Sequence, residues 1–343
     1  MKEKILVTGG TGYIGSHTTV ELIKEKFDVV IIDNLYNSEA EVVDRIHKIT
    51  GVKPVLEVID ICDQKKLDRF FRNNKDIGAI IHFAAYKAVG ESVNKPLDYY
   101  RNNLVSLINI LSGMKSYGIP SLVFSSSCTV YGQPEKLPVT EDASLQPAIS
   151  PYGNTKQIGE EIIRDASFSD KNIKAISLRY FNPIGAHPSA LIGELPRGVP
   201  ENLVPFITQT AYGLRDELKV FGDDYETSDG SCIRDYLHVV DLAKAHVVAV
   251  KRLIEGRNKS NYEVFNLGTG KGVSVLEAIK SFERVSGIKL KYKITGRRAG
   301  DIEKIWADPS FANKELGWKT LSTLDEAMKT AWDWEKNIRN KKR

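Results

Sequence analysis

Short apolar runs alternate with amphipathic stretches through the first half of the chain. The runs are continuously apolar instead of alternating with polar residues, which is typical of parallel strands that are covered on both faces. The stretches between them have helical spacing, so the order strand, helix, strand predicts an α/β fold with a Rossmann-type doubly wound parallel sheet. The predicted strands are 5–8, 29–33, 55–60, 79–83, 122–126 and 175–179, and the predicted helices are 15–26, 38–49, 63–73, 96–116 and 151–167.

The pattern changes after Tyr180. Residues 182–205 are rich in Pro, Gly and Asn, which indicates a long loop over a ligand site. The rest predicts a smaller C-terminal α/β substrate domain, packed by the four tryptophans. We expect a dinucleotide-binding domain at 1–181, with a returning segment near 233–268, and a substrate domain at 182–232 and 269–340. The elements expected here are helices at 204–215, 239–255, 274–286 and 323–339, and strands at 218–221 and 264–267.

Composition excludes several classes of protein. The 343 residues are 42% hydrophobic and 27% charged, which is ordinary for a globular chain. The net charge is +4, but much of it lies in a C-terminal cluster that we interpret as a solvated helix end, so no basic face predicts nucleic-acid binding. The cluster consists of Lys336, Arg339, Lys341, Lys342 and Arg343.

The cysteines and the hydropathy indicate a soluble protein in a reducing compartment. Cys62, Cys128 and Cys232 lie far apart with no CxxC spacing, which argues against disulfides and thiolate metal sites. The first residues lack the apolar core of a signal peptide, and no run approaches the roughly 18–20 apolar residues of a membrane helix. We therefore expect a cytoplasmic protein with no membrane partner. No histidine pattern predicts a metal.

A glycine pattern follows the first predicted strand. Gly9, Gly12 and Gly15 lie between that strand and the first helix, which is the context of a dinucleotide fingerprint. The free N–H groups at such a helix start bind a pyrophosphate. Asp33 ends the second strand, where an acid accepts hydrogen bonds from ribose hydroxyls and repels a 2′-phosphate, so NAD is favoured over NADP. Asp60 is in reach of an adenine or simply caps its strand.

Tyr152 and Lys156 form the candidate catalytic pair. Their i, i+4 spacing places them on one face of a helix that starts near Pro151. A phenol is a poor base at neutral pH, and we expect the nearby ammonium to lower its pKa. Ser127 closes a Ser triplet at the end of the fifth strand, where such sheets bind ligands. Together these groups can bind one substrate hydroxyl and move its proton.

These motifs resemble the extended short-chain dehydrogenase/reductase family and, within it, the UDP-sugar 4-epimerases. The matching runs span nearly the whole chain, and the runs His82–Ser92 and Arg179–Pro188 are more diagnostic of the family than the glycine pattern. They are Thr8–His17, His82–Ser92, Phe124–Gly132, Ser150–Lys156, Arg179–Pro188 and Arg234–Val239.

The resemblance implies interconversion of UDP-glucose and UDP-galactose with tightly bound NAD. Tyr152 would take the 4-hydroxyl proton, Ser127 would orient that hydroxyl, and Lys156 would bind the nicotinamide ribose. A homodimer through helices 96–116 and 151–167 is also implied. The cofactor-binding residues would further include Tyr13, Ile14, Asn34, Asn37, Ile61, Phe83, Ala84, Lys87, Asn102 and Tyr180. The substrate-binding residues would be Lys87, Asn182, Asn202, Leu203, Phe221, Arg234, Tyr236, Arg298, Asp301 and Ile305.

Ile305 occupies the position that, by the resemblance, gates N-acetylated sugars. A Tyr there accompanies exclusion of UDP-N-acetylglucosamine, and a small residue accompanies its acceptance. Ile fits neither pattern, so we expect a weak secondary activity on that sugar. The alternative is that Ile305 only packs against Trp306 and the nearby loop.

Other functions stay open. A nucleotide-sugar 4,6-dehydratase needs a carboxylate after the fifth strand, where this chain has Ser127, Cys128 and Thr129. A UDP-glucuronate 4-epimerase, or another NAD-dependent nucleotide-sugar-modifying enzyme, shares the core machinery. Outside enzymes, a dinucleotide-sensing regulator would keep the fold, but such proteins generally lack the Tyr and Lys pair.

Overall fold

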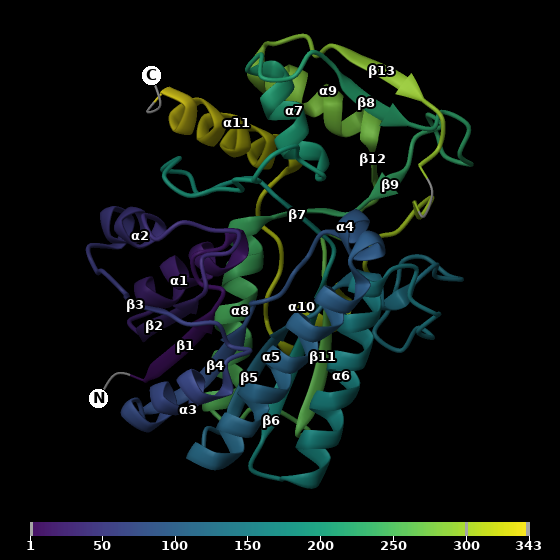
Figure 1. Cartoon of the computed structure of the whole chain (residues 1–343). Helices are drawn as coiled ribbons and strands as arrows, with labels where there is room; N and C mark the ends of the chain where they lie inside the picture. Colours follow the sequence, from purple (N-terminus) through teal and green to yellow (C-terminus); the bar gives the residue numbers. More distant parts are fainter. Residues whose placement is uncertain (1–2, 299–300, 341–343) are drawn as a thin grey trace.

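A seven-stranded parallel sheet forms the centre of the fold (Figure 1). The structure, a computed structural model, describes residues 3–298 and 301–340. The strand order is β11-β6-β5-β4-β1-β2-β3, and each neighbouring pair is parallel. The strands are β1 (Lys4–Thr8), β2 (Asp28–Asp33), β3 (Val55–Val58), β4 (Ile77–His82), β5 (Ser121–Ser125), β6 (Lys174–Tyr180) and β11 (Tyr262–Leu267).

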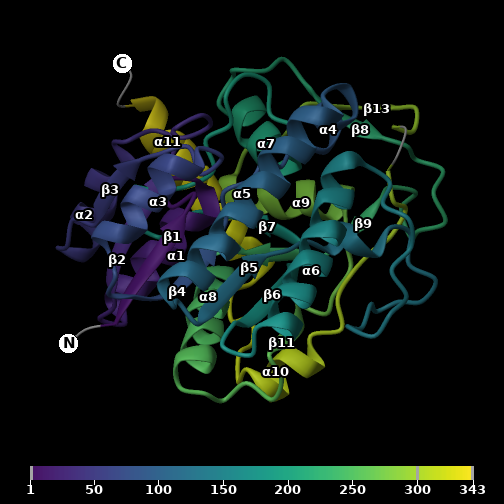
Figure 2. The same cartoon turned by 60° about the horizontal axis from the view of Figure 1, so that its bottom comes forward.

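Each face of the sheet buries its own core. Along β1, Ile5 and Val7 point into a cluster with α1, α2 and α8, whereas Leu6 points into a cluster with α3, α5 and α6. This two-sided burial is why the strands are continuously apolar. Both views show α5 beside α6 (Figure 2). These helices are α1 (Tyr13–Lys24), α2 (Val42–Thr50), α3 (Gln64–Asn73), α5 (Pro96–Tyr117), α6 (Pro151–Ser169) and α8 (Val239–Ile254).

A third core lies above the carboxyl edge of the sheet. It joins α7, α9 and α11 through Ile207, Phe282, Met328 and Trp332. Three short strand pairs, β7 with β10, β9 with β12 and β8 with β13, complete this part. Its elements are β7 (Asn182–Ile184), α7 (Leu203–Ala211), β8 (Leu218–Phe221), β9 (Ile233–Arg234), β10 (Tyr236–His238), β12 (Val273–Ser274), α9 (Val275–Ser286), β13 (Tyr292–Thr295) and α11 (Leu324–Asn340).

The predicted fold class is confirmed, with local corrections. The loop expected at 182–205 contains β7, and α7 ends at Ala211 instead of residue 215. Trp318 does not pack the upper core: it joins the core beneath α8 and donates from Nε1 to the Asp241 carbonyl at 2.9 Å. Of the expected basic tail, residues 341–343 lie outside the described residues. The elements missed in sequence are α4 (Val89–Asn94), α10 (Ser310–Glu315), η1 (Cys128–Tyr131) and the short strands β7, β9, β10, β12 and β13.

Within residues 3–298 and 301–340, every helix is too short or too polar to span a lipid bilayer.

Candidate active site

The glycine loop joins β1 to α1 with no room for side chains. A Cβ on Gly15 would lie 2.2 Å from the Gly9 carbonyl oxygen, and one on Gly9, where φ is +70°, would lie 2.9 Å from the Ala84 nitrogen. Gly12 caps α1, and no side chain in the described part of the protein caps that helix start. Its first-turn N–H groups therefore suit an anion such as the pyrophosphate of NAD. Ile14 packs against the core behind the loop.

Asp33 organises the segment that follows β2. Its Oδ2 accepts the Thr11 N–H at 3.2 Å, and its Oδ1 accepts the Leu35 N–H at 2.9 Å and the Ser38 hydroxyl at 3.1 Å. Sequence reasoning missed Arg197, whose guanidinium reaches this segment from the loop before α7 and donates to three carbonyls there. Asn34 accepts the Tyr36 N–H, and Asn37 is exposed.

A cavity of about 200 Å³ lies beside the ends of β2 and β3. Asp60 and Asn102 line it, as do the rings of Tyr36 and Tyr86, whose centroids are 4.9 Å apart. Ile61 is buried in the core next to it. The cavity therefore brings together Asp60, which was expected near an adenine, and Asn102, which was expected to contact the cofactor.

Ser127, Tyr152 and Lys156 meet at the carboxyl end of β5. Ser150 caps α6, accepting the Gly153 N–H at 3.1 Å, so the helix starts directly before Tyr152. Lys156 donates from Nζ to the Ser125 carbonyl at 2.7 Å and lies 5.8 Å from the centre of the Tyr152 ring. All three predicted catalytic side chains are buried, with exposed fractions of 7%, 9% and 4% for Ser127, Tyr152 and Lys156.

Burial controls the protonation of this pair. It raises the pKa of Tyr152 well above the ordinary value, Tyr180 raises it further, and a hydrogen bond with Ser127 lowers it. Burial lowers the pKa of Lys156 to about 8, and the charge of Glu160 opposes that change. The expected lowered phenol pKa is not produced by the protein's own residues, because the loss of hydration outweighs the nearby groups.

The ends of β4 and β6 form the wall behind the pair. Tyr180 shares a short hydrogen bond with Ser125, and burial raises its pKa to about 12. His246 of α8 lies between Phe83 and Tyr180, with ring centroids 4.6 Å and 5.9 Å away. Sequence analysis missed His246, although its place on the buried face of a long helix was a signal for packing.

Glu194 links two predicted ligand residues. Its Oε1 lies 2.9 Å from Lys87 Nζ and accepts the Asn202 amide at 2.7 Å. The Lys87 ammonium also lies 5.8 Å from the centre of the Tyr13 ring. Nothing in the sequence pattern singled out Glu194, because Lys87 is distant along the chain.

Two arginines and an aspartate gather above the sheet, as the resemblance implied. Arg298 donates to Asp301 at 2.7 Å, and the Arg234 guanidinium lies 4.0 Å from the same carboxylate. The Arg298 guanidinium also lies over the Phe221 ring at 5.2 Å. The group can hold a diphosphate, since guanidinium groups match phosphate oxygens.

The remaining predicted substrate residues lie deeper. Asn182 pairs with Tyr236 across β7 and β10, and Tyr236 is buried with a raised pKa. Leu203 packs on the upper core at the start of α7. Ile305 is 2% exposed and belongs to an apolar cluster with Val130 of η1, the turn directly after Ser127.

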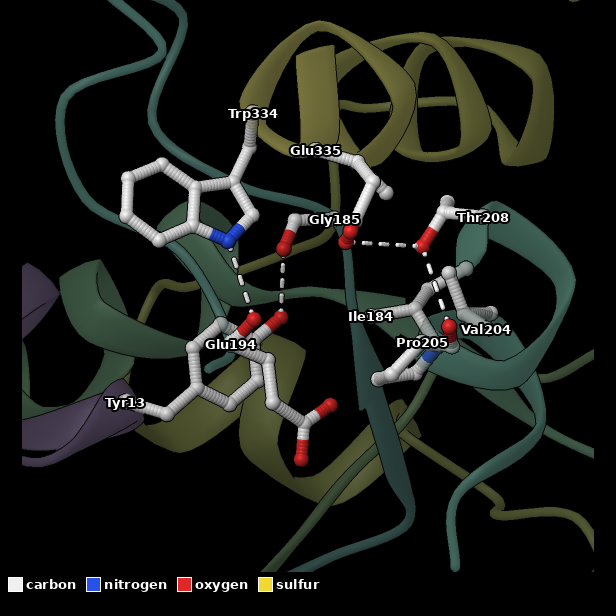
Figure 3. A pocket seen from close by; sticks show the side chains of 10 residues that line it. Tyr13, Ile184, Gly185, Glu194, Val204, Pro205, Thr208, Trp334 and Glu335 are labelled. Carbon is white, nitrogen blue, oxygen red and sulfur yellow. Dashed lines mark hydrogen bonds between the residues drawn. The ribbon is translucent and has the colours of Figure 1, made fainter. Parts of the chain in front are cut away.

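A second cavity is lined by Tyr13, the first residue of α1, and by residues of β7, α7 and α11 (Figure 3). Tyr13 donates to the Gly185 carbonyl at 2.6 Å, and Trp334 donates to the Glu194 carbonyl at 2.9 Å. At about 10 Å³ it has room for roughly one water, so it is not a substrate site. In the described part of the chain, no three His, Cys, Asp or Glu side chains cluster as metal ligands would.

Comparison with known proteins assigns this arrangement to a family. The family model described as GDP-mannose 4,6 dehydratase matches residues 6–331. The UDP-glucose 4-epimerase of Bacillus subtilis is 49% identical over 331 residues, covering 96% of each chain. A UDP-glucose-4-epimerase structure from Stenotrophomonas maltophila, with bound NAD and formylated UDP-arabinopyranose, has a TM-score of 0.95, 47% identity and 99% coverage of both chains. The UDP-Glc/GlcNAc 4-epimerase of Campylobacter jejuni has a TM-score of 0.84 and 36% identity, covering 98% of this chain and 99% of that one.

Gly15→Ala should empty the cofactor site. The added Cβ collides with the Gly9 carbonyl, so the loop must move away from its pyrophosphate-binding shape at a cost of about 1–3 kcal/mol. We expect a lower melting temperature and loss of most bound NAD, measured by absorbance after denaturation of the purified protein. Gly296→Ala is the matched control, because its Cβ would meet nothing within 4 Å. Full NAD content in Gly15→Ala would show that the loop does not hold the cofactor.

Proposed function

The chain belongs to the UDP-glucose 4-epimerases, within the GDP-mannose 4,6 dehydratase family, and on this basis we propose that it interconverts UDP-glucose and UDP-galactose. The observation that carries the proposal is the meeting of Ser127, Tyr152 and Lys156 at the carboxyl end of β5. The glycine loop follows β1 at the same edge of the sheet. A group that moves a proton therefore lies on the edge that binds a dinucleotide.

NAD is the cofactor, and when bound it would supply the hydride acceptor and donor for sugar C4. Its pyrophosphate would lie on the N–H groups of α1, and its adenosine would lie in the cavity beside Asp60 and Asn102. Asp33 would bind the ribose hydroxyls. Arg197 is already bonded to carbonyls of the neighbouring segment, so it does not offer a free cation to a 2′-phosphate.

The three catalytic residues divide the proton chemistry. Tyr152, in its phenolate form, would take the proton of the 4-hydroxyl as the C4 hydride leaves with both electrons of its C–H bond, which gives a 4-keto sugar. Ser127 orients the hydroxyl through its hydrogen bond to the same phenol. Lys156 would bind the nicotinamide ribose, and its ammonium is held in place by a hydrogen bond to the Ser125 carbonyl. Tyr152 returns the proton when the hydride comes back.

The UDP group would lie against the upper part of the protein. Arg234 and Arg298 would clamp the diphosphate, and Phe221 would support the Arg298 side chain. The other residues proposed to contact the nucleotide sugar are Lys87, Asn182, Asn202, Leu203, Tyr236 and Asp301. Accordingly, we propose a cofactor domain of residues 1–181 with 233–268, and a substrate domain of residues 182–232 and 269–340.

The other candidate activities have less support. Dehydration needs a carboxylic acid after β5, and η1 there begins with Cys128 and Thr129. A dinucleotide-sensing regulator would not need a buried Tyr, Ser and Lys group. A UDP-glucuronate 4-epimerase is the remaining alternative. A panel of UDP-sugars assayed without added NAD would show whether the enzyme acts on UDP-glucuronate or on UDP-galactose.

We propose that two copies associate through α5 and α6. Leu97, Val105 and Ile108 of α5 and Phe168 of α6 are exposed apolar side chains on these neighbouring helices. Such a face is typical of an interface between subunits. The three free cysteines also favour a cytoplasmic location.

Tyr152→Phe tests the acid–base assignment. The ring and its packing remain, so binding of the UDP-sugar and NAD should persist, while kcat falls by about 10²–10⁴-fold because the proton acceptor is lost. The measurement is UDP-galactose turnover with KM and kcat determined separately. Tyr212→Phe removes a phenol that bonds to Asn340 and should keep native turnover. Near-native kcat in Tyr152→Phe would assign the proton transfer to another group.

Cofactor choice can be tested on the apo-protein. Reconstitution with NAD should restore turnover, whereas NADP should not, because the Asp33 carboxylate repels a 2′-phosphate. Asp33→Asn should narrow the difference between the turnover restored by NAD and that restored by NADP, because it weakens that repulsion. Equal recovery of the wild type with both cofactors would refute the role of Asp33.

Substrate selection at C2 would depend on Ile305. Its cluster with Val130 lies next to the Ser127 turn, and its N–H donates to the Ile233 carbonyl at 3.1 Å, so the backbone position is fixed. Compared with Tyr, the shorter Ile would leave part of the space that an acetamido group needs. Apolar differences of this size change selectivity by about 1–3 kcal/mol, which predicts partial acceptance.

We therefore predict weak epimerisation of UDP-N-acetylglucosamine that falls further in Ile305→Tyr, while UDP-glucose activity is kept. Both activities are compared as kcat/KM. If the wild type has no activity on the acetylated sugar, or if the substitution leaves the ratio unchanged, Ile305 only packs in its cluster.

A further inference from the structure

Glu160 is a buried carboxylate directly behind the catalytic group. It lies on α6 one turn after Lys156 and has an exposed fraction of 0%. Its Oε1 accepts the Ser126 hydroxyl at 2.5 Å and Arg179 Nε at 3.0 Å, and its Oε2 accepts Arg179 Nη2 at 2.6 Å. A charge in this position is costly unless it is fully paired, and here both oxygens are bonded.

The bond to Ser126 connects Glu160 to the catalytic segment. Ser126 lies between Ser125, whose carbonyl accepts a hydrogen bond from Lys156, and Ser127, whose hydroxyl lowers the pKa of Tyr152. Lys156 and Glu160 both lie on α6, so this helix holds the segment at two adjacent residues, Ser125 and Ser126. The orientation of Ser127 therefore depends on an anchor outside the catalytic group itself.

The charge of Glu160 also acts on Lys156. It raises the pKa of Lys156, against the lowering caused by burial. The other groups around the ammonium are neutral: Tyr152 on α6, Phe124 on β5 and His82 on β4, whose pKa burial lowers to about 3. Tyr180 on β6 is neutral as well, because its pKa is raised to about 12.

The groups around Glu160 balance its own charge. Arg179 on β6 neutralises it, and Tyr131 of η1 bonds to the same guanidinium at 2.9 Å. Burial raises the pKa of Tyr262 on β11, and the charge of Glu160 raises it further.

We propose that Glu160 is a positioning residue of the catalytic centre, which anchors the Ser125–Ser127 segment through Ser126 and lies one turn from Lys156 on the same helix. The proposal rests on the function proposed above for Ser127, Tyr152 and Lys156. It predicts two separable effects of Glu160, one on the geometry of Ser127 and one on the charge of Lys156.

Three variants of the full-length, NAD-loaded enzyme separate these effects. Ser126→Ala removes the anchor and keeps the ion pair, so kcat should fall about tenfold with the pH profile unchanged. Glu160→Gln removes the charge, so the alkaline limb of the kcat profile should move to lower pH by about one unit. The double variant Glu160→Gln/Arg179→Gln leaves no unpaired buried charge and should show a smaller movement in the same direction, even if the single variant folds poorly.

Glu263→Gln is the matched control. Glu263 forms a two-bond pair with Arg252 at the edge strand β11, at distances of 2.8 Å and 2.9 Å, and its side chain is 9% exposed. Its loss should lower the melting temperature as the loss of Glu160 does, but kcat and the pH profile should stay native. A difference in kcat or in pH profile between Glu160→Gln and Glu263→Gln, compared at equal melting temperature, therefore reports positioning and not folding.

A second readout does not depend on turnover. NMR of selectively ¹³C-labelled lysine follows the titration of Lys156, whose signal is identified by its loss in Lys156→Met. The midpoint should fall in Glu160→Gln and in the double variant, and stay native in Glu263→Gln. A native midpoint and native kcat in both Glu160 variants would overturn the proposal. If the wild type turned over none of the UDP-sugars, the proposed function would fail, whereas the lysine titration would still test Glu160.

Discussion

A buried ammonium at the carboxyl edge of a parallel sheet is the constraint on which the site depends. Lys156 is 4% exposed, so its charge must find partners inside the protein. The Ser125 carbonyl accepts a hydrogen bond from it, the centre of the Phe124 ring lies 4.9 Å away, and Glu160 supplies the opposite charge. Each partner belongs to β5 or α6, which fixes the strand end against the helix and places Ser127 beside Tyr152.

The sheet order brings this centre next to the glycine loop. Between β4 and β1 the direction of strand addition reverses, and the crevice at such a reversal is where doubly wound sheets bind their ligands. Phe83 follows β4 and Gly9 follows β1, so the residues that approach each other across the crevice come from adjacent strands. The return of α8 and β11 to the sheet completes the wall, because His246 contacts both Phe83 and Tyr180.

The sequence predicted what repeats locally and missed what is joined over long distances. The six strands and five helices expected in the first half follow from apolar runs and helical spacing, and they are present with shifts of a few residues. The short strands of the upper part, such as the two-residue β9, have no period that could reveal them. Arg197 and Glu194 bind partners more than a hundred residues away in the first half, so no local pattern marks them. Trp318 was misplaced because an isolated tryptophan does not indicate which core it enters.

The unequal effects of burial on the catalytic pair explain why surrounding charges matter. Loss of hydration raises the pKa of Tyr152 and lowers that of Lys156, so in both cases it favours the neutral form. Burial alone would therefore leave Tyr152 and Lys156 neutral, whereas proton transfer requires a phenolate and an ammonium. Two groups act against this tendency: the Ser127 hydroxyl lowers the phenol pKa, and the Glu160 carboxylate raises that of the lysine. Because Ser127 is itself placed by the segment bonded to Glu160, one carboxylate influences both halves of the pair.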